Sequence, residues 1–225
     1  MNTNGRPLSV MPLGWSAALL PLLTIHLCFV LSVAQGHIDP CFPYWEGCSS
    51  ISRAGRHGAA YFVFKGGMIP AAVLLAGFWW LNRAWLAQLG QRLPSLPWLG
   101  LVASVALLLY TLTLGHRGEA FHMLRRIGVI GYFGLTFIAQ LKLSAALARS
   151  EPMRIAGQRL VRLSLLTLLI GLLSVLAGLV WPERHDDMED GFEWLLALLL
   201  NVHALAVVAL WRRSGLRLHL QSGPG

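Results

Sequence analysis

The sequence predicts an all-α polytopic membrane protein, with six transmembrane helices in one antiparallel bundle and both termini in the cytoplasm. Three observations lead to this fold class: an apolar composition, six apolar runs long enough to cross a bilayer, and an uneven distribution of arginine between the connecting segments. Of the 225 residues, 56% are hydrophobic and only 12% are charged, whereas a soluble domain carries about 25% charged residues. The mean hydropathy of +0.60 also favours a membrane.

Six runs of the sequence have about the 20 apolar residues that a helix needs to cross a bilayer core. They fill residues 1–225 as a single domain and cover 14–35, 59–82, 97–115, 121–147, 160–181 and 192–211. Because the connections are short, consecutive helices are expected to pack antiparallel. The first run has a second interpretation as a cleaved signal peptide, since Arg6 precedes it and Ser32-Val33-Ala34 resembles a cleavage site.

The charged residues predict the orientation. With a cytoplasmic N-terminus, most arginines fall on the inner side, as the positive-inside rule requires, and this accounts for the net charge of +8 without a nucleic-acid partner. An arginine-rich, lysine-poor chain with short loops predicts the inner (cytoplasmic) membrane of a bacterium. The same orientation places nine of the ten acidic residues outside: Asp39, Glu46, Glu119, Glu183, Asp186, Asp187, Glu189, Asp190 and Glu193.

Small and aromatic residues predict how the helices meet each other and the membrane. Gly66-Gly67, Gly128 and Gly131 indicate close helix contacts, because small residues let backbones approach in lipid. All nine tryptophans fall at or near predicted helix ends or in short loops, where indole rings would lie among the lipid head groups.

Cys41 and Cys48 fall on the outer side, where an oxidising compartment would let them form a disulfide. Two free thiols in a compact loop are the alternative. No CxxC or HxxxH partner accompanies the two cysteines, so the sequence predicts neither a metal site nor a cofactor.

Basic residues at membrane depth are the sharpest functional signal. Lys65, Arg125 and Arg126 lie in the outer halves of predicted spans, where a charge is costly and usually faces a partner or a wet cavity. Snorkelling toward the head groups is the alternative for each one alone. Because arginine and lysine suit phosphate, we expect an anionic lipid head group to bind the outer basic residues Arg53, Arg56, Lys65, Arg125 and Arg126.

Further polar residues lie beside and below this basic group. His122 shares a helix face with one of the two arginines of the fourth span. With Glu119 nearby, it is the candidate general base if the protein is an enzyme that transfers an acyl or head group. We expect a polar cavity floor nearer the membrane centre, formed by His26, Asn201, His203 and Glu193. The structural alternative is a hydrogen bond between helices from His26 to Asn201 or His203.

Residues 50–65, SISRAGRHGAAYFVFK, resemble the Frag/DRAM/Sfk family of six-span membrane proteins. The first outer loop of that family carries Pro-Ser-(Ile/Val)-Ser, then Ala and Gly, and then Tyr-x-Trp-Arg at the start of the second span. The chain has Tyr61 in the expected place and departs from the pattern at Ser49, Phe64 and Lys65, which replace Pro, Trp and Arg. The likeness continues at 119–122 and at 193–203.

The resemblance implies a role with membrane lipids, because the family includes a factor for lipid remodelling of GPI anchors and the N-terminal region of a yeast protein that places ceramide on those anchors. It does not imply a particular reaction. The alternative is a membrane scaffold or regulator whose outer acidic loop, Glu183 to Glu193, docks a membrane or periplasmic protein. A transporter is a third possibility, disfavoured because only one side of the bundle is polar at depth.

Overall fold

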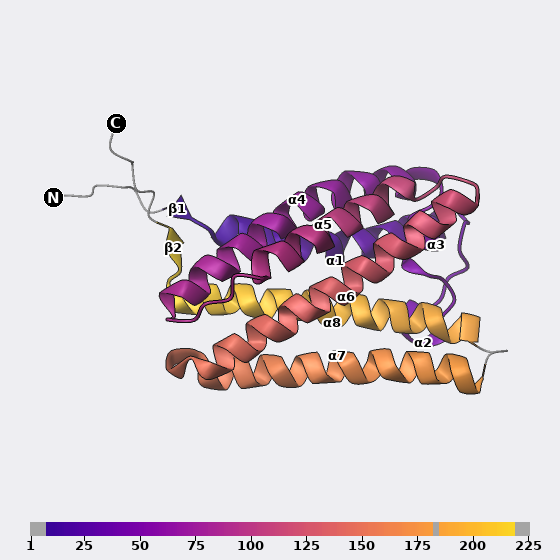
Figure 1. Ribbon diagram of the computed structural model, residues 1–225. Coiled ribbons are helices and arrows are strands. Elements are labelled where there is room, and N and C mark those ends of the chain that lie inside the picture. The colour runs from indigo at the N-terminus through magenta and orange to yellow at the C-terminus, as the bar shows by residue number, and fades with distance from the viewer. Residues whose placement is uncertain (1–7, 182–184, 219–225) are drawn as a thin grey trace.

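The computed structural model describes residues 8–181 and 185–218 and contains six long helices in this part of the chain (Figure 1). Each of the six is long and apolar enough to cross a membrane, which confirms the predicted all-α membrane fold. The long helices are α1 (Met11–Ala34), α4 (Gly58–Gln88), α5 (Leu96–Thr113), α6 (Glu119–Arg149), α7 (Arg154–Val180) and α8 (His185–Ser214).

Shorter elements connect or flank the long helices. Two helices of one turn, α2 (Pro43–Glu46) and α3 (Ile51–Ala54), lie between α1 and α4, and a 3-10 turn, η1 (Glu151–Met153), precedes α7. Strands β1 (Leu8–Ser9) and β2 (Arg217–Leu218) form a two-stranded antiparallel ladder. This ladder joins the two ends of the described chain, which therefore lie at the same end of the bundle (Figure 1).

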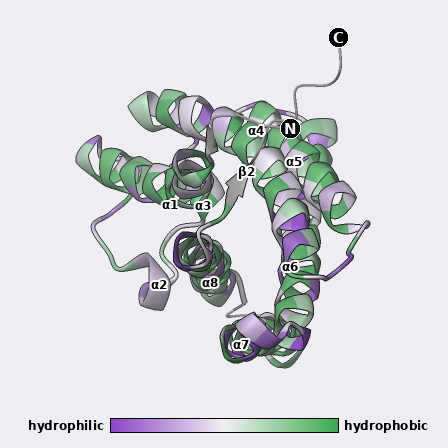
Figure 2. Cartoon of the chain, turned by 90° about the vertical axis from the view of Figure 1, so that its left-hand side faces the viewer, coloured by the Kyte–Doolittle hydropathy of each residue, from purple (hydrophilic) through white to green (hydrophobic). Residues whose placement is uncertain are grey.

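The six long helices form one bundle in which each packs against its neighbours in the sequence, in the order α1, α4, α5, α6, α7 and α8, and α8 packs back on α1. Viewed from the end where the chain ends meet, α4 and α5 lie on the opposite side of the bundle from α7, with α8 between (Figure 2). Hydrophobic residues predominate along the long helices in the same view. The outward side of α7 is an apolar surface suited to contact with lipid chains, because Leu165, Leu169, Leu172 and Leu179 are all exposed.

Several helices extend beyond the predicted apolar runs. α4 continues to Gln88, α7 begins at Arg154, and α8 begins at His185. An apolar run marks only the segment that crosses hydrocarbon, whereas the helix continues into the polar region around it. The predicted acidic loop 183–193 is therefore wrong from residue 185 onward, because these residues form the first turns of α8. Acidic side chains stabilise the start of a helix, since the helix dipole is positive there. Glu183 lies outside the described residues.

Four of the nine tryptophans contradict the predicted position at the membrane surface. Trp79, Trp85, Trp194 and Trp211 are at most 1% exposed, because they pack inside the bundle. Three of them donate their indole N–H to a partner distant in the sequence, as buried tryptophans usually do. The bonds are Trp85 to Ser214 Oγ (3.1 Å), Trp194 to the Ser49 carbonyl (2.7 Å) and Trp211 to Asn82 Oδ1 (3.2 Å).

Glycine allows close helix contacts at three of the four predicted positions, including Gly131 of α6, where a Cβ would lie 3.2 Å from the Ala106 Cβ of α5. A Cβ on Gly128 of α6 would lie 2.7 Å from the backbone nitrogen of Tyr110 in α5, and one on Gly67 of α4 would overlap Thr24 of α1. Gly66 differs, because nothing lies within 4 Å of the position of its Cβ. Gly128 therefore sets the distance between α6, which carries Arg125 and Arg126, and α5, which carries Tyr110.

Candidate functional site

The outer loop between α1 and α4 is attached to the start of α8. The disulfide between Cys41 and Cys48 is present, which confirms the prediction, and it encloses α2. Beyond it, the Ser49 carbonyl accepts the Trp194 indole N–H, and a Glu193 carboxylate oxygen accepts the Ile51 N–H at 3.1 Å. Ser49 and Ile51 are thus both held to α8, through hydrogen bonds with the adjacent residues Trp194 and Glu193.

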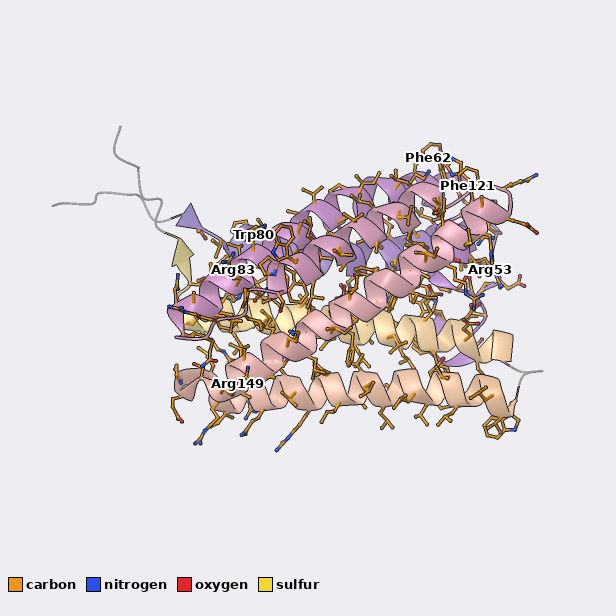
Figure 3. The ribbon with its side chains drawn as sticks, in the orientation of Figure 1. Arg53, Phe62, Trp80, Arg83, Phe121 and Arg149 are labelled. Carbon is orange, nitrogen blue, oxygen red and sulfur yellow. A yellow bond between two sulfur atoms is a disulfide. The ribbon has the colours of Figure 1, made fainter. Side chains whose placement is uncertain are left out.

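The Ser-Ile-Ser segment forms the short helix α3. Ser50 caps it, since its hydroxyl accepts the Arg53 N–H at 3.1 Å, and the Ser52 hydroxyl lies 3.2 Å from that of Ser50. Serine is among the residues preferred at a helix N-cap. This cap and the attachment to α8 position Arg53 at the end of the bundle opposite the chain ends (Figure 3), and Arg56 follows α3 in the sequence.

A cavity of about 540 Å³ lies next to α3, between the N-terminal halves of α6 and α8. Gln140 and Ser144 of α6 bond to the Leu200 carbonyl and to His203 of α8 in the inner half of the bundle. Figure 1 shows α6 crossing the bundle diagonally, close to α7 at one end and away from it at the other. The cavity is lined by Ser50, Ser52, Arg56, Tyr110, His122, Arg125, Arg126, Val129, Ile130, Phe133, Ser174, Glu189, Asp190, Phe192, Glu193 and Leu196.

One wall of the cavity is basic. His122, Arg125 and Arg126 line it from α6, and Arg56 lines it from the segment after α3. Arg125 is held in place because its Nη1 donates to the carbonyls of His116 (3.0 Å) and Thr113 (3.3 Å) at the end of α5. Burial, and then the positive charge of Arg125, lowers the pKa of Arg56. The Arg56 guanidinium keeps its charge but is partly shielded from water. A bound anion would therefore stabilise it.

The facing wall is acidic. Glu189, Asp190 and Glu193 line the cavity from the first turns of α8. Glu193 is fixed by its bond to the Ile51 N–H, and an Asp190 oxygen lies 3.9 Å from Arg53 Nη1 in an ion pair. The predicted site included Glu193 but none of the other acidic lining, because residues 183–193 were predicted to form an acidic loop with a role only in partner docking.

Tyr110 of α5 is a lining residue that sequence reasoning missed. The side chain is only 5% exposed, and its hydroxyl has no hydrogen-bond partner among the described residues. Arg56 Nε, on the same cavity, is also buried without a partner. A buried polar atom without a partner is costly, so both atoms are suited to a ligand. The available signal was that Tyr110 is the single tyrosine of the third span and directly follows the aliphatic residues 105–109.

The structure brings together Arg56, Arg125, Arg126 and His122 on this cavity, but the three other residues predicted for head-group binding or catalysis do not line it. Lys65 lies between α4 and α5, with its Nζ donating to the Tyr61 hydroxyl (2.6 Å) and to the Leu112 carbonyl (3.4 Å). Arg53 pairs with Asp190 from above, and its side chain is 56% exposed. Glu119 is an exposed residue at the first position of α6.

The predicted polar floor is divided between separate places. His26 does not bond to Asn201 or His203; its Nδ1 lies 2.7 Å from the Leu22 carbonyl and its Nε2 2.7 Å from the Tyr44 hydroxyl. His203 contacts Ser144 of α6 at 2.8 Å. The sequence predicts how deep each of these residues lies in the membrane, but not which helix packs against it. Depth alone therefore could not identify the hydrogen-bond partners of His26 and His203.

Only Asn201 and Glu193 of the predicted floor share a space. Both line a second cavity of about 30 Å³ inside the bundle, which also touches Tyr110 and Phe133 of the larger cavity. The remaining lining of this inner space is mostly apolar, including Leu107 and Leu200. In the described part of the chain, no group of three His, Cys, Asp or Glu side chains is placed to hold a metal ion.

The six apolar helices and the exposed apolar surface of α7 define a multi-pass membrane protein, and a charged cavity lies between its helices. Residues 9–209 match the family model described as the Frag1/DRAM/Sfk1/Cwh43P N-terminal domain. The chain belongs to this family, which confirms the resemblance of residues 50–65. No curated protein and no solved structure matches the chain.

Proposed function

We propose that the protein binds a phospholipid or glycolipid through an anionic group in the lipid head, in the cavity between α6 and α8. The observation that carries the proposal is the basic wall formed by Arg56, Arg125, Arg126 and His122 inside a membrane-spanning bundle. Arginine binds phosphate through two parallel hydrogen bonds, and such charge-assisted bonds are about twice as strong as neutral ones. The unpartnered Arg56 Nε and Tyr110 hydroxyl supply further donors.

The rest of the cavity suits the hydrophobic part of a lipid. Val129, Ile130 and Phe133 of α6 and Leu196 of α8 follow the charged residues on their helices and line the same space. Ile130 is also 61% exposed on the outside of the bundle. A lipid could therefore place its head among the charged residues while its chain stays in contact with the bilayer.

The proposed orientation places this cavity in the outer half of the membrane, with both chain ends in the cytoplasm. It rests on the distribution of arginine along the sequence. The family match and the helices support a multi-pass membrane protein. The same findings do not support the location that the composition predicted, the inner membrane of a bacterium.

Lipid retention by the purified protein tests the proposal. The protein is purified in detergent, mixed with equal amounts of phosphatidylethanolamine, phosphatidylglycerol and phosphatidylcholine, and examined by native mass spectrometry for total bound phospholipid. In the variant Arg125→Gln with Arg126→Gln, we expect retention to weaken by at least roughly tenfold, because each charge-assisted bond contributes about 1.5–3 kcal/mol. Lys65→Gln is the matched control, since it removes a cation that lies outside the cavity. Equal retention by the two variants would contradict the proposal.

A transfer reaction is a further step within the same proposal. His122 lines the cavity and is the candidate general base, whereas Glu119 lies outside it. Glu193 is one of the three carboxylates that share the cavity with His122. In the wild-type protein, conversion of bound lipid that is lost in His122→Ala while retention persists would support a catalytic role. Partner docking by the acidic segment stays an untested alternative, and three of its described acidic residues line the cavity.

A further inference from the structure

The cavity is unusual because its two long walls carry opposite charge. His122, Arg125 and Arg126 line it from α6, whereas Glu189, Asp190 and Glu193 line it from α8. A ligand with only negative charge would satisfy the first wall and be repelled by the second. The two walls together are complementary to a head group that has a negative and a positive end.

We infer that the lipid bound in this cavity is zwitterionic, with a phosphate on the basic wall of α6 and a primary ammonium on the acidic wall of α8, as in phosphatidylethanolamine. This inference rests on the proposed function and specifies the head group. A primary ammonium has three N–H donors for carboxylate oxygens, whereas the trimethylammonium of phosphatidylcholine has none. The structure therefore favours ethanolamine over choline as well as over an uncharged alcohol such as glycerol.

Two independent features place the phosphate. Arg125 is already held by the His116 and Thr113 carbonyls, so its guanidinium is fixed at the cavity before a ligand arrives. The Arg56 Nε and the Tyr110 hydroxyl are buried on the same cavity and have no partner among the described residues. A phosphate oxygen would accept hydrogen bonds from these donors, which removes the cost of leaving them unpaired.

The acidic wall is positioned by the outer loop. Glu193 accepts the Ile51 N–H through one carboxylate oxygen, and Trp194 next to it fixes α8 against Ser49. One oxygen of Glu193 is therefore committed to the backbone. The ammonium would lie among the carboxylates of this wall.

The distribution of bound lipids tests the inference in the same native mass spectrometry experiment, because all three lipids compete for the wild-type protein. We expect phosphatidylethanolamine to be retained roughly tenfold more than phosphatidylglycerol or phosphatidylcholine, the factor that one charge-assisted hydrogen bond confers. In Glu189→Gln with Asp190→Asn, this preference should fall to near equality or turn toward phosphatidylglycerol. The matched control is Asp39→Asn, which removes an exposed carboxylate of the outer loop.

Each outcome separates the inference from the proposed function. Phospholipid retention that depends on Arg125 and Arg126 but favours phosphatidylglycerol or phosphatidylcholine would overturn the zwitterionic inference and leave the proposed function intact. Retention that does not depend on those arginines would overturn both. The wild-type preference decides the inference even if the acidic variant fails to fold.

A soluble competitor distinguishes a lipid from a free head group. Glycerophosphoethanolamine carries the same charges without acyl chains, so we expect it not to displace phosphatidylethanolamine at equal concentration, because Ile130, Phe133 and Leu196 would contact the chains. Equal displacement would show that the cavity binds the head group alone, and would overturn the assignment of a lipid.

Discussion

Replacing Gly128 by alanine tests whether the close contact between α5 and α6 holds the site together. The added Cβ would lie 2.7 Å from the Tyr110 nitrogen and 2.9 Å from the Ala106 carbonyl oxygen. Both are backbone atoms of α5, so no side-chain rotation relieves the contact. Helix α6, which carries Arg125, must move away from α5, which carries Tyr110.

The contact distances give the size of the effect. Ordinary van der Waals contact begins at 3.4 Å, so the helices must separate by about 0.7 Å, the difference from 2.7 Å. Overpacking of this kind typically costs about 1–3 kcal/mol, and replacing glycine by alanine inside a helix returns about 0.5–1 kcal/mol. We therefore expect Gly128→Ala to lower the free energy of unfolding by about 1–2 kcal/mol.

Thermal unfolding of the detergent-purified protein, followed by tryptophan fluorescence, measures this effect. A loss of that size corresponds to a Tm roughly 2–8 °C lower for a chain of this length. Gly66→Ala is the matched control, because nothing lies within 4 Å of its Cβ position, and its Tm should be unchanged or slightly higher. Equal Tm values for the two variants would refute the close contact. A lower Tm with unchanged lipid retention would show that the spacing of α5 and α6 does not control the site.

Two further predictions concern the outer loop. Trp194→Phe keeps an aromatic ring but removes the indole N–H, which leaves the Ser49 carbonyl without its buried donor. The free energy of unfolding should therefore fall by about 1–3 kcal/mol, and a Tm equal to that of the wild type would contradict this attachment. Replacing both Cys41 and Cys48 by serine opens the loop between them, which should lower the stability by about 2.5 kcal/mol in the chain-entropy description. Dithiothreitol should then lower the Tm of the wild type and leave that of the double variant unchanged, and any other pattern would show that the disulfide does not stabilise the fold.

The fold was largely predictable because the bilayer imposes a length on each helix. Six apolar runs identified the six spans, and the structure extends them into polar segments such as the first turns of α8, which hydropathy does not assign to a helix. The disulfide could be predicted because Cys41 and Cys48 fall in one short outer segment. Burial of Trp79 and Trp211 could not, because tryptophan suits both the membrane surface and a packed interior.

The site was only partly predictable, because sequence gives the depth of a residue but not the helix that it faces. Arg125 and Arg126 were identified as charges that require a partner, and both line the cavity. Lys65 was assigned with them on the same reasoning, yet it faces the end of α5. Tyr110 was missed because its role depends on lying opposite Arg56, a residue far away in the sequence.

Photo-crosslinking tests the central claim, binding of a lipid head group in the cavity between α6 and α8, most directly. A phospholipid with a photoreactive group in its head is added to the protein in bilayer nanodiscs, and the labelled peptides are mapped by mass spectrometry after irradiation. The structure predicts adducts concentrated on residues 122–133 of α6 and 189–196 of α8, which line the cavity. Adducts confined to the exposed leucines of α7, with none on those two segments, would contradict the account.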